Sequence, residues 1–402
     1  MSKVGKPKKK QRMWSNDFLL ERSMLSNEDI ITKLKKTELK ELEENLNMPE
    51  EVFNYLLDLI KPHISKKDTI MRNAITAEER LAVTLRFLYS GMDYSKLKLI
   101  YKISAQAIAR IVPETCLAIF KTLKNEYLRF PQNEKEWREI AEGFHNSCQF
   151  ENCIGAIACK HVPIQRPPQS LGQFTNHEGT CSIILCGIVN SNYDFIYIHE
   201  GVNGSVVDGE VYLRGTEFFD KWLDDDLNIP DANRLQKSNF VCPYGFVGDE
   251  TFALSENLWT PYPIEKSSLK EEVFNYRLNR ARQVVEDTFG HLISKFKVFQ
   301  KPLRVKLEHL DPIILGTCTL HNFLKAHSVD YMTAEDVDVE DLERGIVVPG
   351  AWRKNKELLA FEKTKIDSMV ESKELRDKLR DYYWNEGKVP FQYKMINSVK
   401  EE

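Results

Sequence analysis

The hydrophobic periodicity of this chain changes at Asn152, and that change constrains its fold more than any other feature. From about residue 25 to residue 144 the apolar residues recur at helical spacing, which predicts a helical region. Beyond Asn152 they gather in short runs, CIGAIACKHVPI, TCSIILCGIVNSN and DFIYIHEGV, which predict three strands. A helix after Asp208, a buried strand YGFVGD and a long helix over about 270–296 follow. We therefore expect an α/β domain with a mixed sheet and flanking helices, preceded by an all-helical region.

These segments divide the 402 residues into five regions. The stretch from Asp330 to Glu343 holds seven acids and no base, which favours a flexible solvated linker over an interface. The helical pattern resumes after it. The expected regions are a basic tail 1–24, a helical region 25–146, an α/β domain 147–327, an acidic linker 328–348 and a helical C-terminal tail 349–402.

Within the helical region, the segment MDYSKLKLIYKISAQAIARIV has the layout of a helix-turn-helix. Ser104 is the expected N-cap of its second helix, which would present Gln106 and Arg110 outward. Such side chains could contact bases or phosphates of DNA. An ordinary pair of antiparallel helices would give the same pattern, so both interpretations stay open here.

Charge and cysteine content exclude some classes of protein. The formal net charge is −4, so any affinity for nucleic acid must come from local patches. No apolar run approaches the roughly 18 residues of a membrane span, and we expect no membrane partner. The eight cysteines form no C-x-x-C pair and most lie in apolar surroundings, which favours reduced core residues over a zinc site.

A basic segment near the N-terminus, KPKKKQR, resembles a monopartite nuclear localisation signal. The alternative is a solvated basic tail. We expect a nuclear protein, with a cytoplasmic fraction left open. The residues that would carry the signal are Lys8, Lys9, Lys10 and Arg12.

Three carboxylates stand where strands or helices could present them to one point. Asp249 follows the apolar run FVG, at the strand end where open α/β sheets place their ligand-binding groups. Glu286 borders the apolar stripe of the long helix, and Asp208 stands at the start of a helix. Each has an ordinary explanation as well: Asp208 as a helix-terminal charge, Asp249 as a turn residue, and Glu286 as half of an ion pair.

Five blocks, CIGAIACKHVPIQRP, GSVVDGEVY, FVGDETFAL, FNYRLNRARQVVEDTFGHL and LHNFL, resemble in order and spacing those of the PIF/Harbinger transposases and the nuclease-like proteins derived from them. The similarity runs from the helix-turn-helix through Leu324 and includes ELRDKLRDYYWNEGKVPFQ. It implies an RNase H-like core that cuts phosphodiesters with a divalent metal, Mg²⁺ or Mn²⁺. The family's acids fall at Asp208, Asp249 and Glu286, but its first Asp falls on Ala158.

The chemistry of the family explains why Ala158 matters. Two metal ions about 3.5–4 Å apart activate water and stabilise the charged oxygens of the transition state. The Asp on the first strand usually bridges these ions, and alanine cannot bind either. Strand alternation puts Lys160 on the same face as Ala158, where a lysine would repel metal. We therefore expect nuclease activity to be absent or reduced by orders of magnitude, unless Glu151, Glu178 or Glu200 compensates.

Basic residues on and after the long helix could contact DNA phosphates, chiefly Arg277, Arg280 and Arg282. The alternative is that they pair with neighbouring acids of the same helix. Family members act with a separate Myb/SANT-like DNA-binding protein, so the resemblance implies DNA and such a protein as partners.

Three functions remain open at this point. The first is a domesticated transposase that keeps its fold and nuclear address without cutting DNA. The second is an active metal-dependent endonuclease with a compensated site. The third is a protein-binding scaffold.

Overall fold

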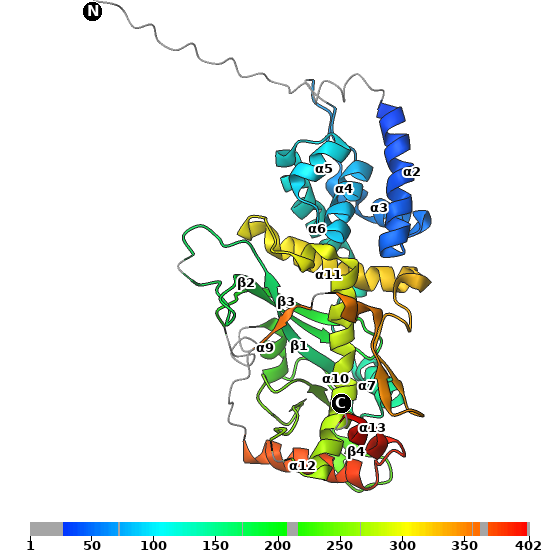
Figure 1. The fold of residues 1–402 in the computed structure, drawn as a ribbon, viewed down its shortest axis with the longest axis vertical. Coiled ribbons are helices and arrows are strands. Elements are labelled where there is room, and N and C mark those ends of the chain that lie inside the picture. Colours follow the sequence, from blue (N-terminus) through cyan, green and yellow to red (C-terminus); the bar gives the residue numbers. More distant parts are fainter. Residues whose placement is uncertain are drawn as a thin grey trace, which may run out of the picture.

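The computed structural model describes residues 27–70, 73–170, 172–206, 216–265, 267–355, 357–361 and 369–399. The basic segment with Lys8, Lys9, Lys10 and Arg12 lies outside these residues, and so does Asp208. A helical N-terminal region stands at one end of the molecule and a sheet with its covering helices at the other (Figure 1). The expectation of a mixed α/β protein with many helices is confirmed.

Local sequence signals set the ends of the N-terminal helices. A capping box between Thr76 and Glu79 begins α4, and Gly91 ends it in the left-handed conformation at φ 61°. A side chain at Gly91 would also come 2.7 Å from the carbonyl oxygen of Lys297, so only glycine fits there. The helices are α2 (Asn27–Leu46), α3 (Glu50–Ile64), α4 (Ala77–Ser90), α5 (Tyr94–Tyr101), α6 (Ala105–Tyr127) and α7 (Glu134–Cys148).

The short helix α5 and the long helix α6 meet at 100°, with three residues between them. The side chain of Ser104 accepts a hydrogen bond from the N–H of Ala107, as its predicted role at the start of α6 requires. Among the described helices none alone is long and apolar enough to cross a membrane, and only this bent pair passes that test when joined. Ile108, Ile111 and other apolar side chains of α6 are buried in the protein core.

The sheet has the order β3-β2-β1-β6-β7, and β10 pairs with β1 outside this path. β2 is antiparallel to both β1 and β3, whereas β6 is parallel to β1 and β7. The strands are β1 (Cys153–Pro163), β2 (Ser182–Val189), β3 (Phe195–Asn203), β6 (Gly245–Val247), β7 (Leu258–Trp259) and β10 (Leu359–Ala360). A separate pair consists of β4 (Asn233–Arg234) and β5 (Val241–Cys242).

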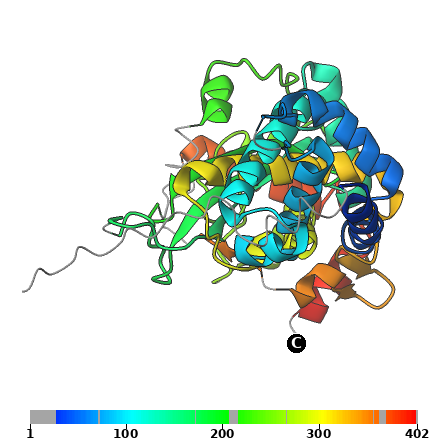
Figure 2. The ribbon, with the colours of Figure 1, turned by 90° about the horizontal axis from the view of Figure 1, so that it is seen from above.

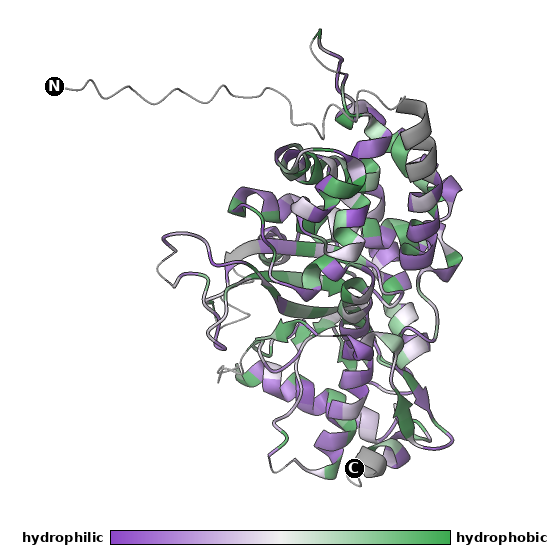
Figure 3. Ribbon diagram, turned by 45° about the horizontal axis from the view of Figure 1, so that its top comes forward, coloured by the Kyte–Doolittle hydropathy of each residue, from purple (hydrophilic) through white to green (hydrophobic). Residues whose placement is uncertain are grey.

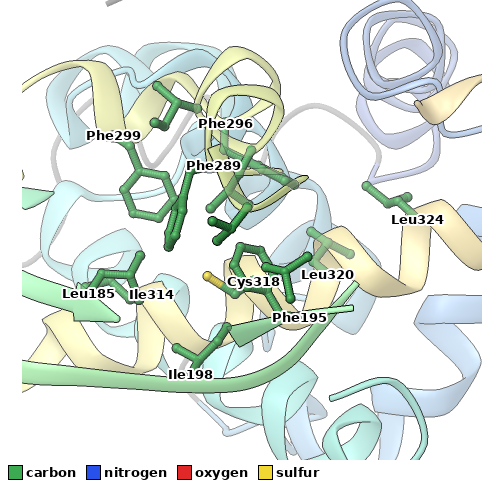
Figure 4. Packing of buried hydrophobic residues seen from close by; sticks show 14 of the residues in the cluster. Leu185, Phe195, Ile198, Phe289, Phe296, Phe299, Ile314, Cys318, Leu320 and Leu324 are labelled. Carbon is green, nitrogen blue, oxygen red and sulfur yellow. The ribbon is translucent and has the colours of Figure 1, made fainter. Parts of the chain in front are cut away.

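Helices cover both faces of this sheet. On one face lie α10 (Leu269–Lys295) and α11 (Leu310–His327), and on the other α7 and α9 (Glu217–Leu223). Phe289 of α10 meets Phe195 of β3 edge-on, with ring centroids 5.4 Å apart, in the core drawn in Figure 4. α11 also packs against α6, so it joins the sheet to the helical region. Figure 2, a view from above, shows that region in front of the sheet. The C-terminal helices α12 (Val370–Trp384) and α13 (Gln392–Val399) pack on α10.

The acidic segment 328–348 is not the solvated linker that its charge predicts. It contains a hairpin of β8 (Val339–Asp341) and β9 (Ile346–Val348), and two of its acids anchor it to arginines outside the segment. Glu340 pairs with Arg280 of α10 at 2.7 Å, and Asp338 pairs with Arg353. Interaction with arginines outside the segment therefore offsets the repulsion among its acids.

Two of the eight cysteines are also not reduced as expected. Cys159 and Cys186 face each other in the β1–β2 register and form a disulfide. The spacing of cysteines along the chain carried no sign of this pair, because the antiparallel register sets it. The other six, of which five are buried, are free.

Candidate active site

The alanine that the resemblance aligns with the family's first Asp lies in the middle of the sheet. Ala158 is 1% exposed and faces the side covered by α10. Ala156 of β1 pairs with Val247 of the parallel strand β6, and Ala158 and Asp249 each follow that pair by two residues. The register therefore places Asp249, just beyond the end of β6, at the level of Ala158 in the middle of the neighbouring strand β1.

Asp249 is partly exposed and uses one of its carboxylate oxygens locally. Its Oδ1 accepts hydrogen bonds from the backbone N–H of Thr251, at 3.0 Å, and from the Thr251 hydroxyl. This is a turn stabilised by an Asp side chain, as sequence reasoning allowed. Its second oxygen, Oδ2, takes part in neither of these bonds.

Glu286 is held by two cations. Lys160 Nζ donates to Glu286 Oε2 at 2.6 Å, and Arg282 Nη1 donates to Glu286 Oε1 at 2.8 Å. The side chains of Lys160 and Glu286 are only 9% and 16% exposed. Strand alternation correctly placed Lys160 on the face of Ala158, but it could not predict that Lys160 reaches Glu286.

The contacts with Lys160 and Arg282 lower the pKa of Glu286 although its carboxyl group is buried. Burial alone would raise the pKa of the carboxyl group. The charges and hydrogen bonds of Lys160 and Arg282 outweigh burial and hold the pKa below its ordinary value. Glu286 is therefore a carboxylate at neutral pH, and its charge is already balanced by protein.

The described residues do not fit a two-metal centre. Ala158 has no ligand atom, and both oxygens of Glu286 are bound to cationic side chains. Over the residues that the structure describes, no three His, Cys, Asp or Glu side chains are grouped so as to hold a metal ion. Lys160 in particular brings a positive charge to the face where Mg²⁺ would need oxygen ligands.

Two of the three side chains considered as replacements for the family's first acid, Glu151 and Glu200, are poorly placed to serve. Glu151 accepts a hydrogen bond from Tyr382 and lies 3.1 Å from His145. In the sheet register Glu200 aligns with Leu185, which in turn aligns with Lys160, so a whole strand separates Glu200 from Lys160. Burial, with a smaller effect from Asp311, raises the pKa of Glu200 to about 8, so it is mostly neutral at pH 7.

Of the three arginines expected to contact DNA, Arg277 is buried in the protein, and this corrects the expectation. It is 2% exposed and donates to the carbonyl oxygens of Gly387, at 2.9 Å, and Gln149. Its guanidinium also lies over the ring of Tyr383. Arg280 bonds the carbonyl oxygen of Cys148 at 2.9 Å besides its pair with Glu340. The helices at the C-terminus cover this side of α10, so the arginines there hold the fold together.

This role predicts a large loss of stability when Arg277 is changed to Met. We expect the free energy of unfolding to fall by about 3 kcal/mol, because buried carbonyl oxygens lose their donor. Urea denaturation followed by circular dichroism measures it. Arg344, whose side chain is 78% exposed, is the matched control, and Arg344→Met should cost under about 0.5 kcal/mol. Equal effects of the two changes would contradict the structural role of Arg277.

Gln106 and Arg110, the residues predicted to face outward on α6, are both exposed. They lie in the N-terminal region, on a different part of the chain from the site around Glu286. They remain candidates for contact with DNA.

The region that contains Ala158, Asp249 and Glu286 is similar to a known protein family. Residues 157–322 match the family of DDE superfamily endonucleases. This segment starts one residue before Ala158, and it includes Asp249 and Glu286. The segment is therefore similar to DDE superfamily endonucleases, and within it alanine stands at the level of Asp249 while Glu286 is bound to lysine and arginine.

Curated relatives extend the similarity beyond that segment. The human protein "Putative nuclease HARBI1" is 23% identical over 285 residues, which cover 70% of this chain and 76% of that protein. Its rat counterpart is 24% identical over 289 residues with the same coverage. The Arabidopsis thaliana "Protein ALP1-like" is 23% identical over 300 residues, covering 72% of this chain and 71% of that protein. No solved structure matches the chain.

Proposed function

We propose that this chain is a domesticated, transposase-derived protein of the DDE endonuclease family that has lost most or all nuclease activity and acts in the nucleus as a DNA- or protein-binding factor. The observation that carries the proposal is the ion pair between Lys160 and Glu286. A carboxylate that would bind metal in a nuclease is bound here by an ammonium group of the chain itself. The fold is kept while the chemistry of its site is changed.

The strand arrangement supports an RNase H-like domain. Three antiparallel strands are followed by two that run parallel to the first, in the order β3-β2-β1-β6-β7. Asp249 follows β6 and Glu286 lies on α10, and these are the elements on which the resemblance implies two of the family's acids. In an active relative, the metal would activate water and stabilise the leaving oxygen. In this chain the Lys160 and Arg282 side chains neutralise Glu286 and leave it no free oxygen for that role.

The direct test is plasmid nicking by the full chain. We expect supercoiled plasmid in Mg²⁺ or Mn²⁺ to be nicked no faster by this protein than by its Glu286→Gln variant, which reports contaminating nuclease. Nicking that is well above this background and is abolished by Glu286→Gln would instead support the active endonuclease with a compensated site.

DNA binding through the α5–α6 pair is the second part of the proposal. The perpendicular arrangement of these helices and the exposure of Gln106 and Arg110 support a helix-turn-helix. We expect Arg110→Ala to weaken binding of a duplex about three- to tenfold at low salt and to lower the salt slope by about one. Gel shifts at graded salt measure both. Arg344→Ala, on the acidic hairpin, is the control and should leave both values unchanged; if it weakens binding equally, Arg110 has no special role.

A further inference from the structure

The segment that connects α10 to α11 concentrates positive charge. Residues 296–306 hold four bases and no acid, in a chain whose formal net charge is −4. In Figure 1 this segment joins the upper end of α10 to α11. Hydrophilic residues occur on helices throughout the molecule (Figure 3), so the sign of the charge, and not polarity alone, distinguishes the segment. We call residues 296–306 the basic strap.

The basic strap is fixed to the protein by its backbone and its apolar side chains. The N–H of Leu303 donates to the carbonyl oxygen of Pro163 at 2.9 Å, and the N–H of Gln165 donates to the carbonyl oxygen of Leu303 at 3.0 Å. The buried side chains of the strap, each at most 4% exposed, are Phe296, Val298, Phe299 and Leu303. Because these side chains point inward, the bases between them are left on the surface.

A further cation lies beside the strap. Ile164, just after β1, forms a parallel bridge with Leu303, so the chain that follows β1 runs along the strap. Arg166 comes two residues after this bridge on one chain, and Arg304 comes one residue after it on the other. Both arginines are exposed and belong to the same stretch of surface.

The cations of this surface are free to bind a ligand. Four of them are exposed, and their side chains make no hydrogen bond or ion pair with any residue that the structure describes; we call them the strap cations: Arg166, Lys297, Lys301 and Arg304. Lys306 is not counted among them, because it pairs with Glu308 at 3.1 Å. Arg280 and Arg282 of α10, in contrast, each pair with a glutamate. The charge that sequence reasoning assigned to α10 is therefore available on the strap instead.

The strap begins next to the helix pair proposed to bind DNA. Its first turn, η1 (Lys297–Gln300), packs against α4. Gly91, at the end of α4, lies so close that an added Cβ atom would be 2.7 Å from the carbonyl oxygen of Lys297. The helix α5 starts three residues after Gly91. The basic surface thus adjoins the segment that leads into the α5–α6 pair.

The spacing of the strap cations suits the backbone of a duplex. Lys301 has an extended backbone, and Arg304 follows three residues later, so their Cα atoms are up to about 10 Å apart. Each strand of a duplex carries one phosphate per roughly 3.4 Å of helix axis. Two cations at this spacing can therefore meet different phosphates of one strand.

We propose that the strap cations form a second DNA-contacting surface, which binds phosphates of a duplex beside the α5–α6 pair without reading its sequence. Exposed cations without partners can replace the counterions of DNA, and phosphate contacts position a protein on the duplex. A membrane surface would also require exposed apolar side chains, and those named on the strap are buried. The proposal rests on the DNA-binding part of the proposed function and adds a second surface to it.

The test is anisotropy titration of a fluorescein-labelled duplex of about 25 base pairs with the full chain at graded salt. We expect the triple variant Arg166→Gln, Lys301→Gln, Arg304→Gln to bind at least about tenfold more weakly at low salt. The slope of log affinity against log salt should fall in magnitude by about two to three, roughly one per lost phosphate contact. Two duplexes of unrelated sequence should give the same loss, because phosphates carry no sequence information.

A second triple variant removes the same charge from the opposite end of the molecule. Arg234 of β4, Lys237 and Lys378 of α12 are exposed and make no ion pair with any described residue. Figure 1 places β4 and α12 far from α5. Changing all three to Gln should leave the affinity within about twofold, because phosphate contacts act locally. Melting curves by circular dichroism confirm that both triple variants stay folded.

The outcomes separate this proposal from the helix-turn-helix. Equal loss in the two triple variants, or no loss in the strap variant, would overturn the strap proposal; if Arg110→Ala still weakens binding, the helix-turn-helix stands alone. Loss in the strap variant without loss in Arg110→Ala would support the strap and count against the helix-turn-helix. Binding of anionic phospholipid vesicles that the strap variant abolishes, with duplex binding kept, would show a membrane surface and overturn the proposal. The nicking result is independent of all of these.

Discussion

Changing Ala158 to Asp and Lys160 to Thr in the same chain should produce Mg²⁺- or Mn²⁺-dependent nicking of supercoiled plasmid, at least about 100-fold above the unaltered protein. The first change restores a carboxylate at the level of Asp249. The second removes the ammonium group that binds the carboxylate of Glu286. Threonine is chosen because a β-branched residue suits a strand. Both changes are needed, because a carboxylate at position 158 would itself lie on the same face as Lys160.

A single variant and a neutral double variant show which of the two changes produces the activity. Ala158→Asp alone should stay within about tenfold of the unaltered chain, since Lys160 would pair with the new acid as well as with Glu286. Ala158→Asn with Lys160→Thr is the matched control: it has nearly the same shape without the added charge, and should be inactive. Full activity from Ala158→Asp alone would show that Lys160 is not an obstacle. Activity in the Asn control would point to nicking that does not depend on the site.

Lys160→Met should lower the free energy of unfolding by about 3 kcal/mol. The change leaves a largely buried carboxylate with only Arg282 to balance it, and breaking one side of a buried ion pair costs about 3–5 kcal/mol when no other partner remains. Adding Glu286→Gln should recover most of the loss, because the unbalanced charge then disappears. Urea denaturation of the four proteins in this cycle measures the coupling.

An exposed lysine provides the comparison for that cycle. The side chain of Lys135 is 86% exposed and pairs with Glu139 on the surface of α7, so Lys135→Met should cost under about 0.5 kcal/mol. If Lys160→Met costs no more than Lys135→Met, or if Glu286→Gln adds to the damage, the Lys160–Glu286 pair does not have the role assigned to it.

Much of the fold follows from local patterns. The run CIGAIACKHVPI became β1, and the expected long helix over about 270–296 is α10, Leu269–Lys295. Asp249 follows β6 as expected, because a buried apolar run that ends in Gly-Asp marks the end of a strand. These elements are set by the alternation and spacing of neighbouring residues, which the sequence displays directly.

The contacts that decide function depend on distant parts of the chain. Lys160 and Glu286 are 126 residues apart, so strand alternation could give the face of Lys160 but not its partner. From the sequence alone, Arg277 was expected on the exposed side of α10. In the fold, α12 and α13 pack on α10 and Arg277 is buried. The Cys159–Cys186 disulfide likewise depends on the register of two strands. The acidic segment resembled a linker because the arginine partners of Asp338 and Glu340 lie outside it, at Arg353 and Arg280.

The most direct test of the central claim, that side chains of the protein occupy the place of the metal, is isothermal titration of the unaltered full chain with Mn²⁺. We predict no saturable binding with a Kd below about 1 mM, the weak end of the specific range. The Ala158→Asp, Lys160→Thr variant should bind measurably under the same conditions. Saturable binding by the unaltered chain that is lost in Glu286→Gln would contradict the account, since Glu286 would then be free to hold a metal despite Lys160.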